Sequence, residues 1–413
     1  MKPSSIFEKA LLADNPFRIV PELSTTVWAG HEGMKKDFER IVNQSLITSP
    51  SFMAANWGDW GTGKSHCAYY FSYIENLRRI MEENHLKLPE PIALTVQVPK
   101  PLRGGESFPD LYSNIIERIG FEAIEKISQD VSKRINDCLM KQKVDRPTIQ
   151  REIKQVFSEI FVIDDLTKTF LRLAGIPRSP TADERRWIWR YLHREASSSE
   201  LSRLEVVGGI DSYSGLLRAI TGVIRLFTYY DVRYSPIPPY SELFLWIDEC
   251  ETIWELKAAD TFMLLSFLRD LIDSVPNNLT VFLNVSLTGG GSLRDLRALL
   301  GDAVLSRIRE NINFKHLIGT DTASKYVLDL LNHPRYRPPS LKKQCPDDYY
   351  PFSKETLQAI VEKTRPLTPR RINDNCSIVL ELAIHQGIIK KIDDRISKDF
   401  VEKQLPSIPP VPS

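Results

Sequence analysis

Four short apolar runs stand out along the chain, and each is bounded by Gly, Pro, Asn or charged residues. They are Ser51–Trp57, Pro91–Val98, Leu243–Ile247 and Leu279–Leu287. All four are rich in β-branched and aromatic residues, which is typical of strands. Because apolar residues follow one another almost without interruption, the runs predict parallel strands that are covered on both faces.

Segments with helical spacing lie between and after these runs. Leu111–Ile119 and Ile149–Phe161 carry apolar residues at the spacing of one helix face, and the chain after Asn313 is mostly helical in pattern. Strands that alternate with helices favour an α/β fold with a mainly parallel sheet. We expect one long helical region, from about Gly104 to Ser235, between the second and third strands.

The segment after the first predicted strand has the pattern of a phosphate-binding loop. Its residues are Gly58, Asp59, Trp60, Gly61, Thr62, Gly63, Lys64 and Ser65, which match G-x-x-x-x-G-K-[ST] in full. The loop follows a strand and precedes a helical pattern, Cys67–Arg79, which is the context that such a loop requires. Glycines let the backbone aim successive N–H groups at a β-phosphate. Lys64 would reach the β- and γ-phosphates, and the Ser65 hydroxyl would bind Mg²⁺. We extend the predicted nucleotide-binding residues to His66.

The third apolar run ends in two carboxylates, Asp248 and Glu249. At the tip of a strand, Asp248 would hold the metal through water next to Ser65, and Glu249 would polarise an attacking water as a general base. A strand that simply ends in solvent gives the same pattern, but the intact phosphate loop upstream favours the catalytic interpretation. We expect Glu251, two residues further on, to be structural.

Length and charge limit the class of protein. The chain has 413 residues, enough to bury a large core without disulfides or metals. Lys plus Arg is 54 and Asp plus Glu is 53, so the formal net charge is +1. This balance excludes a polybasic binder whose whole surface attracts phosphate, but not a local basic groove.

Cysteine usage and the start of the chain bear on location. The five cysteines are widely spread and form no C-x-x-C pair, which indicates a reducing compartment and no zinc site. The start lacks the apolar stretch of a signal peptide, and no uncharged apolar run approaches the ~18 residues needed to cross a bilayer. We therefore expect a cytoplasmic protein with no membrane partner.

These motifs, in this order, resemble AAA+ ATPases, nearest the branch that contains replication initiators and their defence-system relatives. Asn15–Phe17 and Trp28–Glu32 resemble the segment that packs on adenine in that group. Thr288 stands where such ATPases place a polar "sensor 1" residue near the γ-phosphate, and Asn284, four residues upstream, is the less favoured candidate. The resemblance implies ATP and Mg²⁺ as cofactors. The absence of an Asn-Lys-x-Asp string argues mildly against GTP, by resemblance alone.

Two further segments resemble arginine-bearing parts of AAA+ proteins. Ala303–Glu310 resembles the segment that supplies an arginine finger to a neighbouring subunit, and both Arg307 and Arg309 remain candidates. Pro369–Asn373 resembles the start of the lid helix with the "sensor 2" arginine, here Arg370. A guanidinium suits these roles because it spreads its charge and can engage phosphate oxygens bidentately. The resemblance implies a homo-oligomer and an ATPase that oligomerisation or a partner activates.

The expected fold is an AAA+-like P-loop NTPase with a large insertion and a helical lid. We divide the chain into 1–103 (first part of the core, with the phosphate loop), 104–240 (helical insertion), 241–318 (rest of the core) and 319–413 (helical lid). Far more residues separate Lys64 from Asp248 than a minimal AAA+ core needs, so the surplus forms the insertion. The residues after Arg371 leave no room for the winged-helix DNA reader of replication initiators, which disfavours an origin-binding protein.

The insertion has a layout similar to that of P-loop proteins found with bacteriophage-exclusion (BREX-type) antiviral systems. Glu184–Leu192 leads to Leu204–Val207, and a helix-like stretch, Leu216–Tyr229, precedes the acidic strand tip. The resemblance implies a role in antiviral defence.

Two stretches combine cations with rings or prolines. The first consists of Arg185, Arg186, Trp187, Trp189, Arg190, Tyr191 and Arg194. Such a mixture can stack bases and contact phosphates, but an amphipathic helix with buried rings and snorkelling arginines explains it better. The second, His333–Lys343, is the stronger candidate for nucleic acid, because its prolines keep it in a loop and its charges are all positive. A solvated loop explains it equally well.

Two main functions follow. The first is an ATP-hydrolysing AAA+ protein that assembles on nucleic acid, DNA before RNA, or with a nuclease, helicase or transposase. The second is a nucleotide-dependent switch or scaffold that recruits such a partner with little turnover. A transposition or replication regulator with the same ATPase core is a third possibility.

Overall fold

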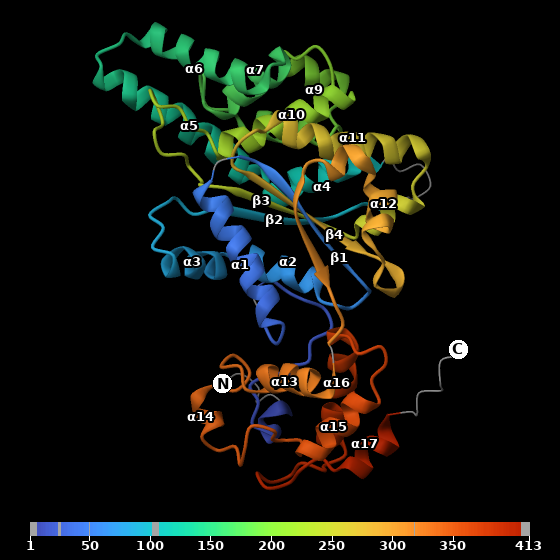
Figure 1. Ribbon diagram of the computed structural model, residues 1–413. Helices are drawn as coiled ribbons and strands as arrows, with labels where there is room; N and C mark the ends of the chain where they lie inside the picture. The colour runs from blue at the N-terminus through green and yellow to red at the C-terminus, as the bar shows by residue number, and fades with distance from the viewer. Residues whose placement is uncertain (1–5, 24–25, 49, 101–106, 318, 406–413) are drawn as a thin grey trace.

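The computed structural model describes residues 6–23, 26–48, 50–100, 107–317 and 319–405. At its centre lies a five-stranded sheet in which every neighbouring pair is parallel, with the order β2-β3-β4-β1-β5. The strands are β1 (Phe52–Gly58), β2 (Ile92–Gln97), β3 (Leu243–Asp248), β4 (Leu279–Ser286) and β5 (Ile308–Phe314). Helices cover both faces (Figure 1). The predicted α/β fold with a parallel P-loop sheet is confirmed, and the four predicted runs form β1 to β4.

The fifth strand was not predicted from the sequence. β5 lies at the edge of the sheet beside β1. Its inner half is buried at Ile312 and Phe314, whereas Arg309, Asn311 and Asn313 are polar and partly or fully exposed. Exposed polar residues interrupt β5, so it lacks the continuous apolar run that reveals the other four strands, including β2 at the opposite edge of the sheet.

The two faces of the sheet differ in the side chains that they bury. The first face packs on α1 (Glu32–Ile47), α2 (Lys64–Ser72) and α3 (Ile74–Glu83), and it is aromatic. Trp246 and Phe282, from adjacent strands, stack with their ring centroids 3.9 Å apart and their planes 8° apart. Phe38 from α1 and Phe71 from α2 pack on Trp246. The predicted helical pattern after the phosphate loop is thus two helices, which meet at Tyr73.

The second face is mostly aliphatic and shares its core with the helical insertion. α11 (Ala258–Ser274) and α12 (Leu293–Leu305) lie on this side with the insertion. The insertion comprises α4 (Ser107–Ile119), α5 (Phe121–Lys141), α6 (Arg146–Phe161), α7 (Asp164–Leu173), α8 (Ala182–Leu192), α9 (Ser198–Arg203) and α10 (Tyr213–Phe227). The predicted insertion is therefore helical, and its buried residues continue the core of the sheet. Its predicted first residue, 104, falls within 101–106, outside the described residues.

A helical lid lies beyond the opposite end of the sheet from the insertion (Figure 1). It consists of α13 (Gly319–Leu331), α14 (Pro339–Lys342), α15 (Lys354–Glu362), α16 (Pro369–His385) and α17 (Lys398–Gln404). Its core also takes in the start of the chain, since η1 (Ile6–Ala10) and Phe17 pack with the lid helices. In the part of the chain that the structure describes, no helix has the length and apolar character needed to cross a membrane.

Candidate nucleotide-binding site

The phosphate loop turns between the end of β1 and the start of α2, and all three of its glycines have positive φ, so a side chain at any of them would strain the backbone. Two of them also lie against close neighbours. Gly58 has φ 154°, and a Cβ there would lie 2.3 Å from the backbone oxygen of Phe314 on β5. Gly61 has φ 73°, and a Cβ there would lie 3.0 Å from the Cβ of Arg370 in the lid. The first glycine thus lets β1 and β5 approach each other, and the second lets the lid approach the loop.

Lys64, the loop lysine, is buried at the first turn of α2 with 6% of its surface exposed. Its Nζ donates to the backbone oxygens of Gly58, at 3.1 Å, and Asp59, at 2.8 Å. Burial lowers the pKa of the ammonium to about 8, although Glu251, Asp248 and Asp59 oppose this shift. The structure therefore places a desolvated cation at the base of the loop.

Asp248 at the end of β3 is held by an amide on the neighbouring strand. Asn284 Nδ2 on β4 donates to Asp248 Oδ1 at 3.2 Å and to the backbone oxygen of Lys64 at 3.3 Å. Asn56 Nδ2 on β1 donates to Asn284 Oδ1 at 2.9 Å. Asp248, Asn284 and Asn56 are buried, so this chain of hydrogen bonds links three adjacent strands next to the phosphate loop.

The sequence prediction preferred Thr288 to Asn284 as the polar residue at this point, and the structure reverses that preference. Thr288 is exposed in the short turn η3 (Thr288–Gly290) and lies outside the residues that line the site. β4 ends at Ser286, so Thr288 lies beyond the strand. Asn284 is still inside the strand and faces the neighbouring strand ends.

Glu249 and Glu251 both line the site. Glu249 adopts φ 57°, which turns the chain sharply after Asp248. Its carboxylate accepts from Gln97 Nε2 at 3.5 Å and lies 3.7 Å from Lys100 Nζ. Glu251, in η2 (Cys250–Glu255), accepts the N–H of Ser286 at 2.9 Å, which fits the structural role expected of it. Burial raises the pKa of Glu251 above its ordinary value.

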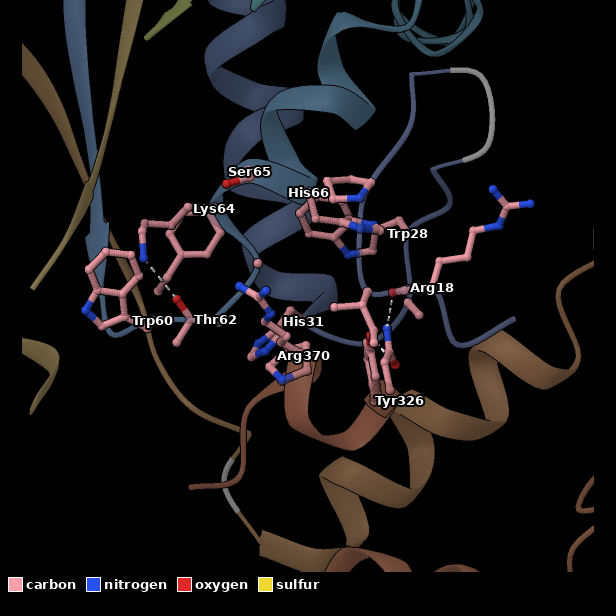
Figure 2. Close-up of a pocket in the computed structure, with 18 of the residues that line it drawn as sticks. Arg18, Trp28, His31, Trp60, Thr62, Lys64, Ser65, His66, Tyr326 and Arg370 are labelled. Atoms are coloured by element: carbon pink, nitrogen blue, oxygen red, sulfur yellow. Dashed lines mark hydrogen bonds between the residues drawn. The ribbon is translucent and has the colours of Figure 1, made fainter. Parts of the chain in front are cut away.

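These groups surround a cavity of about 200 Å³ between the loop, the start of the chain and the lid (Figure 2). Of the predicted loop residues, Trp60 to His66 line the cavity, whereas Gly58 and Asp59 do not. Arg18 and Tyr326 also line it, and the sequence offered no signal for either. Arg18 directly follows the Asn15–Phe17 segment but is not part of it, and Tyr326 lies far from any motif, so only folding brings both to the loop.

The segment expected to pack on a base lies partly where predicted. Trp28, Ala29 and His31 line the cavity. Asn15 is instead tied to α16, where its Nδ2 donates to Ser377 Oγ and Glu381 Oε1, both at 2.7 Å. The first half of the predicted segment therefore anchors the start of the chain to the lid, and the second half faces the cavity.

Two histidines stand at the edge of the cavity. His66 Nε2 lies 2.6 Å from the backbone oxygen of Val27, so this nitrogen carries the proton and donates. Burial lowers the pKa of both His66 and His31, which favours neutral rings. His31 Nε2 is buried, and it has no hydrogen-bond partner among the described residues.

The lid closes directly over the phosphate loop through the start of α16. The backbone N–H of Arg370 donates to the backbone oxygen of Gly61 at 3.2 Å, and the Arg370 side chain lines the cavity (Figure 2). Asn373, one turn further along α16, donates to the backbone oxygen of Arg18 at 2.9 Å and accepts from Tyr326 Oη at 3.0 Å. The predicted lid arginine thus lies at the same cavity as the loop lysine.

The two predicted finger arginines lie elsewhere in their own chain. Arg307 precedes β5 at the amino edge of the sheet, where it forms an ion pair with Asp273 at 2.6 Å. Arg309 lies on β5 with its guanidinium 5.3 Å from the centre of the Phe52 ring. Neither lines the cavity. A role toward a neighbouring subunit therefore stays a prediction.

The aromatic and basic stretch of α8 is structural, as the preferred interpretation held. Arg185 pairs with Glu125 at 2.6 Å, and Arg190 pairs with Glu200 at 2.9 Å. Trp189 packs edge-on against Phe121. These cations have carboxylate partners, so the stretch does not present a free basic surface.

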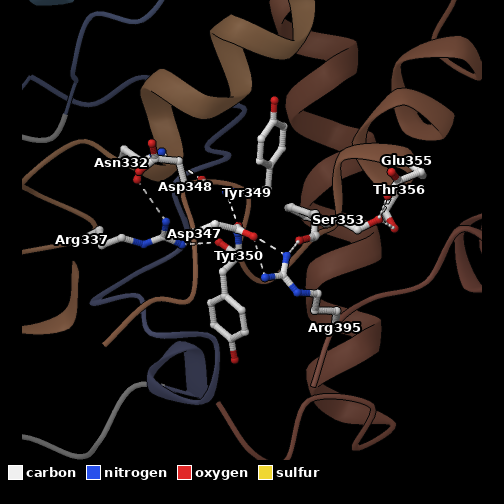
Figure 3. Close-up of polar contacts among 11 residues, drawn as sticks. Asn332, Arg337, Asp347, Asp348, Tyr349, Tyr350, Ser353, Glu355, Thr356 and Arg395 are labelled. Carbon is white, nitrogen blue, oxygen red and sulfur yellow. Dashed lines mark hydrogen bonds and ion pairs between the residues drawn. The ribbon is translucent and has the colours of Figure 1, made fainter. Parts of the chain in front are cut away.

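The stretch His333–Lys343 is only partly the solvated or nucleic-acid-binding loop that its sequence suggested. Arg337 is buried, where it donates to Asn332 Oδ1 at 3.2 Å and to the backbone oxygen of Tyr350 (Figure 3). Lys342 lies 3.8 Å from Asp348. The central arginine thus holds the lid together. The sequence could not reveal this, because one partner, Asn332, follows α13 and the other, Tyr350, lies in the segment after α14.

No protein-family model matches this sequence, and a search of curated proteins finds no match. Solved structures with a similar fold include Drosophila ORC bound to DNA (13% identity, TM-score 0.48, 98% of this chain and 66% of that one). A second is Aeropyrum pernix ORC2 in ADPNP and ADP complexes (12% identity, TM-score 0.44, 93% of this chain and 70% of that one). A third is the Walker-type ATPase of Pyrococcus abyssi (15% identity, TM-score 0.39, 91% of this chain and 73% of that one). At these identities the similarity concerns the fold alone, and the chain spans about two thirds of the length of the Drosophila ORC chain.

The residues present fit a nucleotide with Mg²⁺. The buried Lys64 ammonium offers a donor, the unpartnered His31 Nε2 offers a polar ring nitrogen, and Ser65 and Asp248 offer the hard oxygen ligands that Mg²⁺ prefers. When bound, the nucleotide supplies a phosphoanhydride bond, and the metal neutralises charge on its phosphates. In the chain itself, Asn284 orients Asp248, and the Glu249 carboxylate can accept a proton from water.

Proposed function

We propose that this chain binds ATP with Mg²⁺ and hydrolyses it as an AAA+ protein. One observation carries the proposal: Lys64, Asp248 and Asn284 meet, buried and hydrogen-bonded, at the carboxyl ends of adjacent strands. Ligands of open α/β sheets bind at this edge, next to helix N-termini that favour phosphate. Glu249 and Arg370 add a general base and a cation at the same cavity.

The test measures the rate of phosphate release from ATP in the presence of Mg²⁺, for the purified wild-type chain and for the variant Glu249→Gln. We expect the variant to bind ATP as tightly as the wild type in calorimetry but to turn over about a hundredfold more slowly, because the proton acceptor is gone. Glu255→Gln is the matched control, since Glu255 is exposed on the same turn and outside the cavity. Turnover of Glu249→Gln at the wild-type rate would mean that the base is wrongly assigned. A wild type that binds no ATP at millimolar concentration would reject the proposal.

The proposal includes activation by oligomerisation, with Arg307 or Arg309 acting on the neighbour's nucleotide. Both guanidiniums lie on the side of the sheet away from their own phosphate loop, which is compatible with action in trans. We expect the ATPase rate per subunit to rise steeply with protein concentration. We also expect either Arg307→Ala or Arg309→Ala to abolish this rate. A rate that is substantial but independent of concentration contradicts it.

We further propose that the ATPase works on or with nucleic acid, DNA before RNA, in antiviral defence beside a nuclease, helicase or transposase. This rests on the motif order and on the layout of the insertion. Binding to a DNA duplex that weakens linearly with the logarithm of salt concentration supports it. Binding that is absent at low salt counts against it.

A second candidate function, a nucleotide-dependent switch with little turnover, is favoured by the contacts of Glu249. Gln97 Nε2 and Lys100 Nζ lie 3.5 and 3.7 Å from its carboxylate, where they compete with an attacking water for the carboxylate oxygens. A negligible rate at every protein concentration, with ATP binding retained, would favour the switch. In that case Lys100→Ala should raise the rate.

A further inference from the structure

A large groove opens at the amino edge of the sheet, opposite the edge that carries the phosphate loop. Its volume is about 1300 Å³, and it lies between the insertion and the turns that precede β2, β3 and β4. One wall is formed by the ends of α6 and α10, and the other by the end of α1 and the segment after α11. None of the residues assigned to nucleotide binding lines it.

Exposed apolar side chains gather in this groove. Ile47, Leu88, Tyr230 and Ile237 all line it, and they are 60%, 40%, 58% and 62% exposed. They come from three separate segments of the chain, namely the end of α1, the turn before β2 and the segment between α10 and β3, so their convergence is a product of folding. A contiguous exposed apolar surface in a groove marks an interaction site more often than chance exposure does.

Two hydroxyl groups in the groove are buried, and both lack a partner within the described part of the chain. Tyr229 and Ser241 are each 9% exposed, and neither Tyr229 Oη nor Ser241 Oγ makes a hydrogen bond there. Buried hydroxyls of this kind are nearly always hydrogen-bonded in native proteins. Their position in the wall indicates that a ligand with hydrogen-bonding groups completes them.

The charged side chains of the groove that have no ion-pair partner among the described residues are mainly cations. Lys87 and Arg218 line it, and in the described residues no carboxylate lies within ion-pair distance of either. Arg225 donates to the backbone oxygens of Glu159 and Ile160, at 3.2 Å each, at the end of α6. The pKa of Arg225 is lowered, first by burial and then by the nearby cation of Arg218.

The groove's carboxylates are largely engaged elsewhere. Asp231 pairs with Arg233 at 3.1 Å, and Asp273 pairs with Arg307 at 2.6 Å. Glu159 accepts from Gln155 at 2.9 Å. The free charge that a ligand meets is therefore cationic, and an acidic ligand is complementary to it.

We propose that this groove docks a segment of a partner protein in which apolar side chains are flanked by Asp or Glu. Its apolar residues cover Ile47, Leu88 and Ile237, and its carboxylates pair with Lys87 and Arg218. Its backbone carbonyls accept from the Tyr229 and Ser241 hydroxyls. Nucleic acid fits less well, because Tyr230 is the one exposed ring among the described residues that line the groove, and three carboxylates stand among the cations.

The test uses a display library of random twelve-residue peptides, selected on the full chain. We expect enriched peptides to combine acidic and apolar residues. In fluorescence anisotropy they should bind the double variant Lys87→Glu/Arg218→Glu roughly tenfold or more weakly than the wild type. The matched control is Lys354→Glu/Lys403→Glu, two exposed lysines on the lid at the other end of the molecule. ATP binding and thermal unfolding of each variant verify that it is folded.

Hydrogen exchange provides a second readout that does not depend on the charge variants. A bound peptide should protect the amides of residues 228–241 and 273–278 and leave the phosphate loop unaffected. The proposal is overturned if no peptide is enriched, or if enriched peptides bind the double variant as tightly as the wild type. It is also overturned if the wild type binds a twenty-nucleotide single strand that the double variant releases, because the occupant is then nucleic acid. A change of oligomeric state in the double variant overturns it as well, because the occupant is then a second copy of the chain.

Discussion

The two edges of the same sheet are built in opposite ways. At the carboxyl edge, Lys64, Asp248 and Asn284 are buried, hydrogen-bonded and closed over by the lid, around a cavity of about 200 Å³. At the amino edge, a groove of about 1300 Å³ stays open between the insertion and the sheet, with two unpartnered hydroxyls and exposed aliphatic side chains among the described residues.

The difference reflects which helix and strand ends meet at each edge. Helix N-termini and strand carboxyl ends meet at one edge, where their N–H groups favour phosphate. Helix C-termini meet at the other, and Arg225 binds the last carbonyls of α6 there. A small, enclosed site suits a compact ligand of fixed shape, whereas an open groove with mixed character suits a longer segment. The predictions that follow test whether the two edges are independent.

The largest effect is expected from Lys64→Ala. The variant loses the only ammonium that lines the described cavity, so ATP affinity should fall roughly a hundredfold or more. Calorimetry with ATP and Mg²⁺ measures it, with Lys403→Ala as the exposed-lysine control. If the edges are independent, peptide binding in the groove is unchanged. An unchanged ATP affinity would remove Lys64 from the site.

The next effect separates Asn284 from Thr288. Asn284→Ala leaves Asp248 Oδ1 and Asn56 Nδ2 without their buried partner, which should cost about 1–3 kcal/mol of unfolding free energy. It should also slow ATP turnover about tenfold, because Asp248 is no longer oriented. Thr288→Ala, at an exposed position, should change neither quantity appreciably. Denaturant unfolding and phosphate release measure both, and a larger effect at Thr288 would restore the residue preferred from sequence.

The pH dependence of ATP binding provides a third test at the same edge. Because burial lowers the pKa of Lys64 to about 8, the free protein loses this positive charge as pH rises above 8. ATP affinity should therefore fall by up to about tenfold between pH 7 and pH 9. Bound phosphate stabilises the charged form, so binding at pH 8.5 should take up a proton. Calorimetry in two buffers of different ionisation enthalpy detects it, and affinity that is flat over this range contradicts it.

The smallest effect is expected at Glu242, a buried carboxyl near the amino edge. Its Oε1 accepts from Thr280 Oγ1 at 2.8 Å, and burial raises its pKa well above the ordinary value. The folded state thus keeps the proton that the unfolded state releases, so stability should fall as pH rises above the unfolded pKa. Glu242→Gln should raise the unfolding free energy at pH 8 by about 1 kcal/mol and leave it unchanged near pH 4. Equal effects at both pH values would mean that Glu242 is charged in the fold.

Much of the carboxyl edge was predictable because its signals are local. Gly58 to Ser65 match a loop motif residue by residue, and Asp248 directly follows a strand-like apolar run. The positions of Asn284 and Thr288 relative to the site depend on where β4 ends and which neighbour it pairs with, so spacing alone favoured the residue that lies farther from Asp248. Arg337 shows the same limit, since a run of positive charges along the chain conceals that the central one is buried.

By itself, the sequence determined the strands β1 to β4, the phosphate loop and its acidic neighbour, because each depends on residues adjacent in the chain. Only the tertiary structure decided the edge strand β5, the side chains of Arg18 and Tyr326 at the cavity, and the groove at the amino edge. These features arise where segments far apart in the sequence meet. The physical reason is that burial and pairing are properties of contacts between segments, and such contacts leave no periodic trace along one segment.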